Sequence, residues 1–229
     1  MGDYDHERND KRDREWLGSV PSKPYSDRLP ELEPSLWPDF DAYLTSRNLS
    51  PSIARANLWY PSRRAGDEAP RIVIPASSSD TYNKFWQARA MYGALGFSPV
   101  RYQSPHGCRS GDAVIVVYPV AKDGRYRSVV VEGPMDALAA AGEGCLGVAL
   151  MGAQPPQERI DLTARLVCGT MCYVVIDSDN PATLVAVMSQ LSNLGVQCRL
   201  RAPSPAKDLA ELSPRRRKRL KPAPTGPLP

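Results

Sequence analysis

Acidic residues stand at the ends of two apolar runs, with types and spacing that could hold a metal ion. Glu132 follows three consecutive valines, and Asp136 stands four residues later at the start of an alanine-rich segment. Asp177 and Asp179 follow a second apolar run, residues 173–176. Carboxylates held close together repel one another unless a cation lies among them. Because a ligand set made only of oxygen atoms favours Mg2+ or Mn2+ over zinc, we predict a metal centre suited to phosphoryl transfer.

The second acidic pair also has a simpler interpretation. Asp179 and Asn180 precede Pro181 at the start of a helical pattern, and Asp or Asn followed by Pro is a favoured way to begin a helix. The matching position of Glu132 and Asp136 argues for the metal site, because open α/β sheets bind ligands at the carboxyl ends of their strands.

Alternating strand and helix patterns predict how these acids are positioned. Beyond residue 127, apolar runs predict strands and amphipathic spacing predicts helices, in the order 129–131, 136–141, 147–150, 156–166, 173–176, 184–194 and 196–200. This alternation predicts an α/β fold with a mainly parallel sheet flanked by helices. Residues 36–126 begin with helical patterns and continue with strand patterns at 71–74, 84–89 and 113–118, which predicts a small mixed α+β subdomain.

The two ends of the chain differ from residues 36–126 and 127–212. Residues 1–35 mix charges and prolines with few hydrophobic residues, so we predict a disordered tail. Residues 213–229 form a basic, proline-rich tail whose run 215–221 has six basic residues out of seven. Such a run stays solvated or contacts phosphates, and its charge pattern alone leaves both open.

Composition excludes several classes of protein. The five cysteines form no C-x-x-C pair, which argues against a zinc ribbon and a disulfide framework. No apolar run is long enough to span a membrane and the N-terminus is polar. We therefore expect a cytoplasmic protein without a membrane partner. The net charge of +4 does not by itself indicate a nucleic-acid binder.

The order of the motifs resembles the Toprim catalytic core of bacterial-type (DnaG-like) DNA primases and their phage and plasmid relatives. The pair Glu132-Gly-x-x-Asp136 and Asp177-x-Asp179 carries the resemblance to the Toprim domain. The flanking primase motifs are matched by Arg71-Ile-Val-Ile-Pro75, Phe85-Trp-Gln-Ala-Arg89, Arg101-Tyr-Gln-Ser104 and Lys207-Asp208. The resemblance covers roughly residues 40–212, and a phage-encoded relative would work in the cytoplasm of its bacterial host.

The resemblance implies a nucleotidyltransferase that makes RNA primers from nucleoside triphosphates on single-stranded DNA during DNA replication. It implies that Glu132 acts with the metals as acid or base, and that Asp136 supports the metal site or caps its helix. It implies an Mg2+ (or Mn2+) centre whose ligands are Glu132, Asp177, Asp179 and Asp208. It also implies phosphate contacts from Arg71, Arg89, Arg101 and Lys207.

The sequence departs from the family pattern in one acid and in its missing modules. The second acid of the family's Lys-Asp-x-Asp motif is Ala210 here, and Glu211 is the candidate substitute. We expect no zinc-binding module or helicase domain beside the core, so template selection and helicase coupling would come from the two tails or from other chains, such as a replicative helicase or another replication protein. Two alternatives stay open: a Toprim nuclease that cleaves phosphodiesters, and an inactive primase-derived adaptor that binds DNA or replication proteins.

Overall fold

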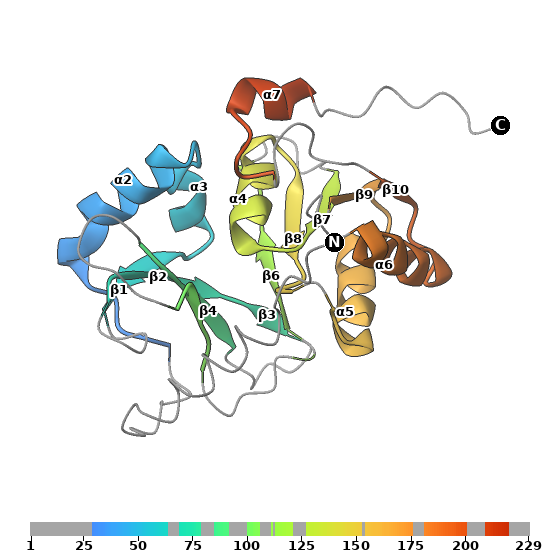
Figure 1. Ribbon diagram of the computed structural model, residues 1–229, viewed down its shortest axis with the longest axis horizontal. Coiled ribbons are helices and arrows are strands. Elements are labelled where there is room, and N and C mark those ends of the chain that lie inside the picture. The colour runs from blue at the N-terminus through green and yellow to red at the C-terminus, as the bar shows by residue number, and fades with distance from the viewer. Residues whose placement is uncertain are drawn as a thin grey trace, which may run out of the picture.

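The structure, a computed structural model, describes most of the chain between residues 29 and 219. The described residues are 29–63, 69–78, 85–91, 100–105, 111, 113–120, 127–152, 154–175, 181–200 and 209–219. They form two β-sheets with helices around them (Figure 1). None of the helices in these ranges is both long enough and apolar enough to cross a membrane.

The N-terminal half builds a four-stranded antiparallel sheet in the order β1-β2-β4-β5. Its strands are β1 (Tyr60–Ser62), β2 (Arg71–Pro75), β4 (Trp86–Ala90) and β5 (Tyr102–Gln103). The strand predicted at 71–74 is thus confirmed, and the strand predicted at 84–89 is confirmed for residues 86–89. A short 3-10 helix, η1 (Pro34–Leu36), leads into α2 (Trp37–Ser46), and α3 (Pro51–Ala56) follows. Helix α3 begins after Ser50, whose hydroxyl accepts the N–H of Ile53 at 3.4 Å as an N-cap.

The C-terminal half builds a six-stranded sheet in the order β10-β9-β7-β8-β6-β3. Its strands are β3 (Ser77–Ser78), β6 (Ala113–Val117), β7 (Ser128–Val131), β8 (Leu146–Ala149), β9 (Cys172–Val175) and β10 (Cys198–Leu200). The four strands from β7 onward pair in parallel, whereas β6 and β3 run antiparallel to their neighbours. The helices between them are α4 (Pro134–Gly142), α5 (Gln157–Val167) and α6 (Pro181–Asn193). The predicted α/β fold with a mainly parallel sheet flanked by helices is confirmed.

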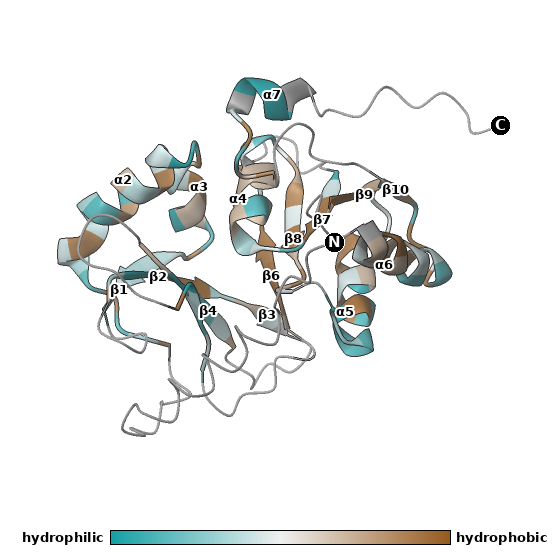
Figure 2. Cartoon of the chain, in the orientation of Figure 1, coloured by the Kyte–Doolittle hydropathy of each residue, from teal (hydrophilic) through white to brown (hydrophobic). Residues whose placement is uncertain are grey.

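Both faces of this sheet are covered, which explains its uninterrupted apolar strands. Val129 and Val131 belong to the hydrophobic cluster that contains α4, whereas Val130 belongs to the cluster that contains residues of α5 and α6. Alternate side chains of a strand point to opposite faces, so one run of valines serves both clusters. Figure 2 shows the brown, hydrophobic strands β6, β7 and β8 between these helices.

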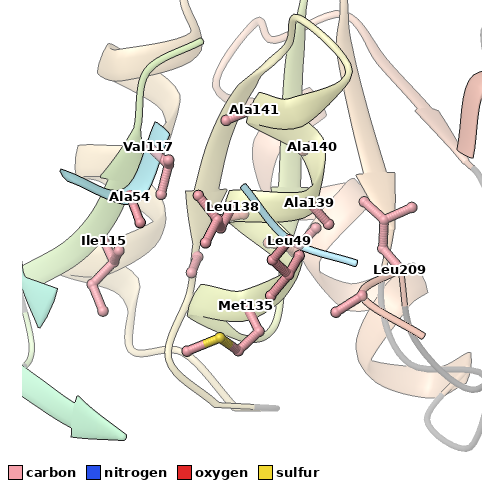
Figure 3. Close-up of a cluster of buried hydrophobic side chains, with 14 of the residues drawn as sticks. Leu49, Ala54, Ile115, Val117, Met135, Leu138, Ala139, Ala140, Ala141 and Leu209 are labelled. Atoms are coloured by element: carbon pink, nitrogen blue, oxygen red, sulfur yellow. The ribbon is translucent and has the colours of Figure 1, made fainter. Parts of the chain in front are cut away.

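Helix α4 packs unusually close to β8. Every residue from Pro134 to Ala141 is buried, and most of these side chains are small, as Figure 3 shows for part of the cluster. A Cβ atom added at Gly147 of β8 would lie 2.2 Å from the carbonyl oxygen of Ala137. Only glycine allows the helix and the strand to approach this closely, so Gly147 sets the position of α4 relative to the sheet.

Two strands that precede the predicted boundary at residue 127 belong to the sheet that follows it. Strands β3 and β6 precede that residue but pair within the six-stranded sheet. All five residues of β6 are buried, and a strand this apolar needs cover on both faces. Ile115 and Val117 accordingly share one core cluster with residues of α2, α3 and α4, so a single hydrophobic core links the regions 36–126 and 127–212.

The predicted tail that begins at residue 213 contains a short helix, α7 (Pro214–Arg219). The helix lies above the end of α4 in the view of Figure 1. Arg215 and Arg216 are exposed, as a solvated basic run predicts. Arg217 differs, because it is buried at 4% exposure. The interpretation of 215–221 as a fully solvated run is therefore wrong at this residue.

Candidate active site

A cleft of about 310 Å³ lies where the four-stranded sheet meets the carboxyl end of β7. Its charged lining consists of three arginines and three acids: Arg47, Arg89, Arg101, Glu132, Asp136 and Glu211. Tyr102, Met135 and Met151 are among the other lining residues. A concave site that combines basic and acidic groups can bind an anion such as a phosphate and also hold a cation beside it. Three of the predicted site residues beyond Glu132, namely Asp136, Arg89 and Arg101, line this one cleft.

Glu132 comes directly after β7 and lies half-buried in the cleft. The parallel register places Val131 opposite Val175, the last residue of β9. The carboxyl ends of β7 and β9 therefore meet at the same edge of the sheet, as the sequence predicts. Asp177 and Asp179 follow β9 in the chain and lie outside the described residues.

Asp136 stands in the first turn of α4, where a negative charge interacts favourably with the helix dipole. Its Oδ1 accepts the backbone N–H of Ala210 at 2.8 Å, and the side chain is 8% exposed. The N-cap of α4 is Gly133, which makes no side-chain cap bond. The carboxylate of Asp136 thus holds a distant segment of the chain beside the cleft, a contact that the sequence does not reveal.

Arg89 is a buried residue that lines the cleft and contacts Tyr43 and Tyr102. Its Nε donates to the hydroxyl of Tyr43 at 3.0 Å, and its guanidinium carbon lies 4.9 Å from the centre of the Tyr102 ring. Burial raises the pKa of Tyr102 to about 12, although the nearby Arg89 acts in the opposite direction. Tyr102 is therefore a neutral phenol at physiological pH, and it packs against the arginine as a cation–π partner.

Arg101 and Arg71 have different surroundings, although both are predicted phosphate ligands. Arg101 is exposed and lines the cleft. Arg71 is fully buried, and its Nη atoms donate to the carbonyl oxygens of Ala88 at 3.1 Å and Val100 at 3.0 Å. These bonds fix the backbone next to Arg101. Because Arg71 is buried, it is better placed to position Arg101 than to contact a phosphate directly. The predicted phosphate contact of Arg71 stays a prediction.

Arg47 is a cleft residue that the sequence analysis missed. It is the C-cap residue of α2, and its guanidinium lies 6.0 Å from the ring centre of Tyr43. Its Nε is buried and has no hydrogen-bond partner among the described residues. A buried donor that lacks a partner is costly unless a ligand or water satisfies it. The only local signal in the sequence is a basic residue near the end of a predicted helix, which is too common to single it out.

The structure describes position 210, where the family pattern has an acid and this chain has alanine. Ala210 is buried at 3% exposure, and its backbone contacts Asp136 as described above. Glu211, the next residue, is exposed and lines the cleft. An acid therefore faces the cleft from this turn, one position later than the resemblance implies. Lys207 and Asp208, which precede the turn, lie outside the described residues.

Of the four predicted metal ligands, the structure describes Glu132. No three His, Cys, Asp or Glu side chains within the described ranges lie close enough together to hold a metal ion. The other predicted ligands, Asp177, Asp179 and Asp208, lie outside those ranges. Glu132 nevertheless fits Mg2+ or Mn2+, because it offers carboxylate oxygens in a cleft whose lining contains no His or Cys.

No protein-family model matches the chain, and no curated protein matches it. Comparison by structure finds primases. The crystal structure of the zinc-binding and RNA polymerase domains of the Aquifex aeolicus primase aligns with a TM-score of 0.58 and 16% identity, over 79% of this chain and 54% of that one. The structure of the DnaG catalytic core aligns with a TM-score of 0.55 and 17% identity, over 78% of this chain and 68% of that one.

These alignments establish what the fold is similar to. The chain spans about half the length of the Aquifex primase fragment. At 16% and 17% identity the similarity is one of fold, namely the mixed α/β fold of DnaG-type primase catalytic cores. A third structure, the bacteriophage T7 lagging-strand DNA polymerase with primase domains of two gp4 subunits, aligns with a TM-score of 0.48 and 15% identity, over 72% of this chain and 80% of that one.

Proposed function

We propose that this chain is a primase-type nucleotidyltransferase core that joins nucleoside triphosphates into short RNA primers on a single-stranded DNA template. One observation carries the proposal: arginines from the N-terminal half and Glu132 at the carboxyl end of β7 line the same cleft. Primer synthesis needs basic groups to bind the anionic triphosphate. It also needs charged groups at the site of reaction, because negative charge is redistributed among the attacking, transferred and leaving oxygen atoms. The similarity to primase catalytic cores supports the same reading.

In this proposal the C-terminal half is a Toprim domain whose acids hold Mg2+ or Mn2+. Glu132 supplies the described carboxylate, and Asp177, Asp179 and Asp208 supply the rest. Bound Mg2+ would neutralise phosphate charge and make the attacking hydroxyl oxygen a better nucleophile. Glu132 would accept a proton from that hydroxyl, since a carboxylate beside the reacting oxygen can act as a general base.

The basic residues bind and orient the triphosphate. Arg101 and Arg47 offer their guanidinium groups to the cleft, and Arg89, which also lines it, supplies positive charge. Guanidinium groups pair with phosphate oxygens through two parallel hydrogen bonds, which fixes orientation as well as charge. In this proposal Lys207 adds a further phosphate contact. A replicative helicase would deliver the single-stranded DNA template.

A primer-synthesis assay tests the proposal. The protein is incubated with Mg2+, the four nucleoside triphosphates and single-stranded DNA, and short RNA products are expected from the wild type. The Asp177→Ala variant should make none. Cleavage of nucleic acid by the wild type without triphosphates would instead identify a Toprim nuclease. Binding of DNA with no synthesis, no cleavage and no affinity for Mg2+ or Mn2+ would identify an adaptor.

A further inference from the structure

One arginine of the basic C-terminal run is bonded to the backbone of two other parts of the molecule. Arg217 is buried, and its Nε donates to the carbonyl oxygen of Leu209 at 3.1 Å. One Nη donates to the carbonyl oxygen of Ala210 at 2.9 Å, and the other donates to that of Asn48 at 3.0 Å. The first of these Nη atoms also lies 3.5 Å from the carbonyl oxygen of Arg47. One guanidinium therefore joins the end of α2 to the turn before α7.

The end of α2 is well suited to receive this guanidinium. The last carbonyl groups of a helix have no partner within the helix and carry its negative dipole end. Arg47 is the C-cap residue of α2, and Asn48 follows it with a left-handed backbone, φ 55°. The side chain of Arg217 thus supplies hydrogen bonds and positive charge to the carbonyl oxygens of Arg47 and Asn48 just after α2, and Arg47 itself lines the cleft.

The turn at 209–212 is bound on its other side to α4. Leu209, Ala210 and Leu212 belong to the core cluster that contains α4, and Figure 3 shows Leu209 beside this helix. The bond from the Ala210 N–H to Asp136 adds a polar contact to the same helix. Arg217 therefore holds together α2, the turn and, through the turn, α4. Each of these segments contributes a charged residue to the cleft: Arg47, Glu211 and Asp136.

We propose that Arg217 is a positioning residue that assembles the cleft: it bonds to the backbone of Arg47 and Asn48 on one side and of Leu209 and Ala210, the two residues before Glu211, on the other. Arg217 is absent from the cleft lining, so it acts through other residues and not on the substrate. The proposal rests on the proposed function only for the identity of the ligand, a nucleoside triphosphate. This positioning role distinguishes Arg217 from its exposed neighbour Arg216. If the basic run acted only as a charged surface for DNA, Arg216 would contribute at least as much as Arg217.

The chain offers a matched pair of variants for the test. Arg217→Met and Arg216→Met remove the same charge from adjacent positions of α7, one buried and one exposed. Arg217→Lys keeps the charge, but an ammonium group is a point donor and cannot reproduce the planar fork of a guanidinium. We expect Arg217→Lys to recover part of the wild-type behaviour and Arg216→Met to match the wild type.

Amide hydrogen exchange measures the assembly without any ligand. In Arg217→Met, exchange at residues 48–50 and 209–212 should speed up about tenfold or more relative to the amides of β7, which serve as an internal reference. Unchanged exchange at both segments would overturn the proposal, as would an equal change in Arg216→Met. If Arg217→Met does not fold, Arg217→Lys is compared with Arg216→Met by the same measurement.

Affinity for ATP with Mg2+, measured by calorimetry, then connects the assembly to the ligand. Arg217→Met should weaken binding about tenfold, and the loss in the double variant Arg47→Met/Arg217→Met should be smaller than the sum of the two single losses, because Arg217 acts in part through Arg47. Equal weakening in Arg217→Met and Arg216→Met would overturn the proposal. A wild type that does not bind ATP, with the expected exchange pattern, would refute the proposed function and leave the positioning role of Arg217 supported.

Discussion

The carboxylate of Asp136 accepts the backbone N–H of Ala210 at 2.8 Å, across 74 residues of sequence. Both residues are buried, and the bond joins the first turn of α4 to the turn that presents Glu211 to the cleft. An acid that resembles a catalytic residue in the sequence therefore has a structural partner. The prediction that Asp136 takes part in catalysis stays a proposal beside this observed contact.

Removing this acceptor should lower the free energy of unfolding. Asp136→Ala leaves the buried N–H of Ala210 without its partner, which costs about 1–3 kcal/mol. Asp136→Asn keeps an oxygen that can accept the same bond and should lose less. Urea unfolding of both variants measures the difference. Equal stability of Asp136→Ala and the wild type would show that the bond contributes nothing.

The Glu132→Gln variant should separate catalysis from binding. The amide has the same shape but cannot accept a proton or hold a cation as well, so primer synthesis should fall about 100-fold or more. Affinity for single-stranded DNA should stay close to that of the wild type. Glu158→Gln is the control, since Glu158 is exposed in the first turn of α5. Full activity of Glu132→Gln would remove this residue from the catalytic site.

Loss of the Arg47 side-chain charge should weaken nucleotide binding. A charge-assisted hydrogen bond contributes about 1.5–3 kcal/mol, so Arg47→Met should bind ATP roughly 10- to 100-fold more weakly. Arg165→Met, at an exposed position in the last turn of α5, should have little effect. Calorimetric titration with ATP and Mg2+ compares the two. Equal affinities would show that Arg47 does not contact the triphosphate.

A methyl group at position 147 should be poorly tolerated. Gly147→Ala places a Cβ 2.2 Å from the carbonyl oxygen of Ala137, so α4 or β8 must move, at a cost of about 2 kcal/mol or more. Gly142→Ala is the matched control, because nothing lies within 4 Å of its added Cβ and alanine favours a helix. Thermal unfolding should show a lower Tm for Gly147→Ala only. A Tm equal to that of the wild type would contradict the close packing of α4 on β8.

Alkaline pH should lower stability partly through Tyr102. Its pKa is raised by burial from 10.0 to about 12, so the folded state holds this proton more tightly than the unfolded state does. The resulting stabilisation is complete below pH 10 and is lost as the pH rises toward 12. Urea unfolding at about pH 9 and about pH 11 should therefore show a smaller loss for Tyr102→Phe than for the wild type. The exposed Tyr118 provides the control Tyr118→Phe, and identical losses in all three proteins would rule out this contribution.

Local sequence patterns were sufficient to predict most of the fold. The valine run of β7 and the amphipathic spacing of α5 and α6 depend on residues close together in the chain, and the structure confirms these elements. The boundary at 127 could not be predicted in the same way. The pairing of β6 with β8 is antiparallel and joins residues 30 to 34 positions apart, and no local pattern states which sheet a buried strand joins.

The position of Glu132 at the carboxyl end of a buried strand could be predicted from the sequence, because strand periodicity and the glycine that follows are local features. The surroundings of four arginines, by contrast, became visible only in the folded chain. Arg101 and Arg47 line the cleft, Arg71 is buried on backbone carbonyls, and Arg217 reaches across 169 residues to Asn48. The side chain is the same in all four cases. Its surroundings differ because burial and hydrogen-bond partners come from segments far apart in the chain, which composition and spacing do not specify.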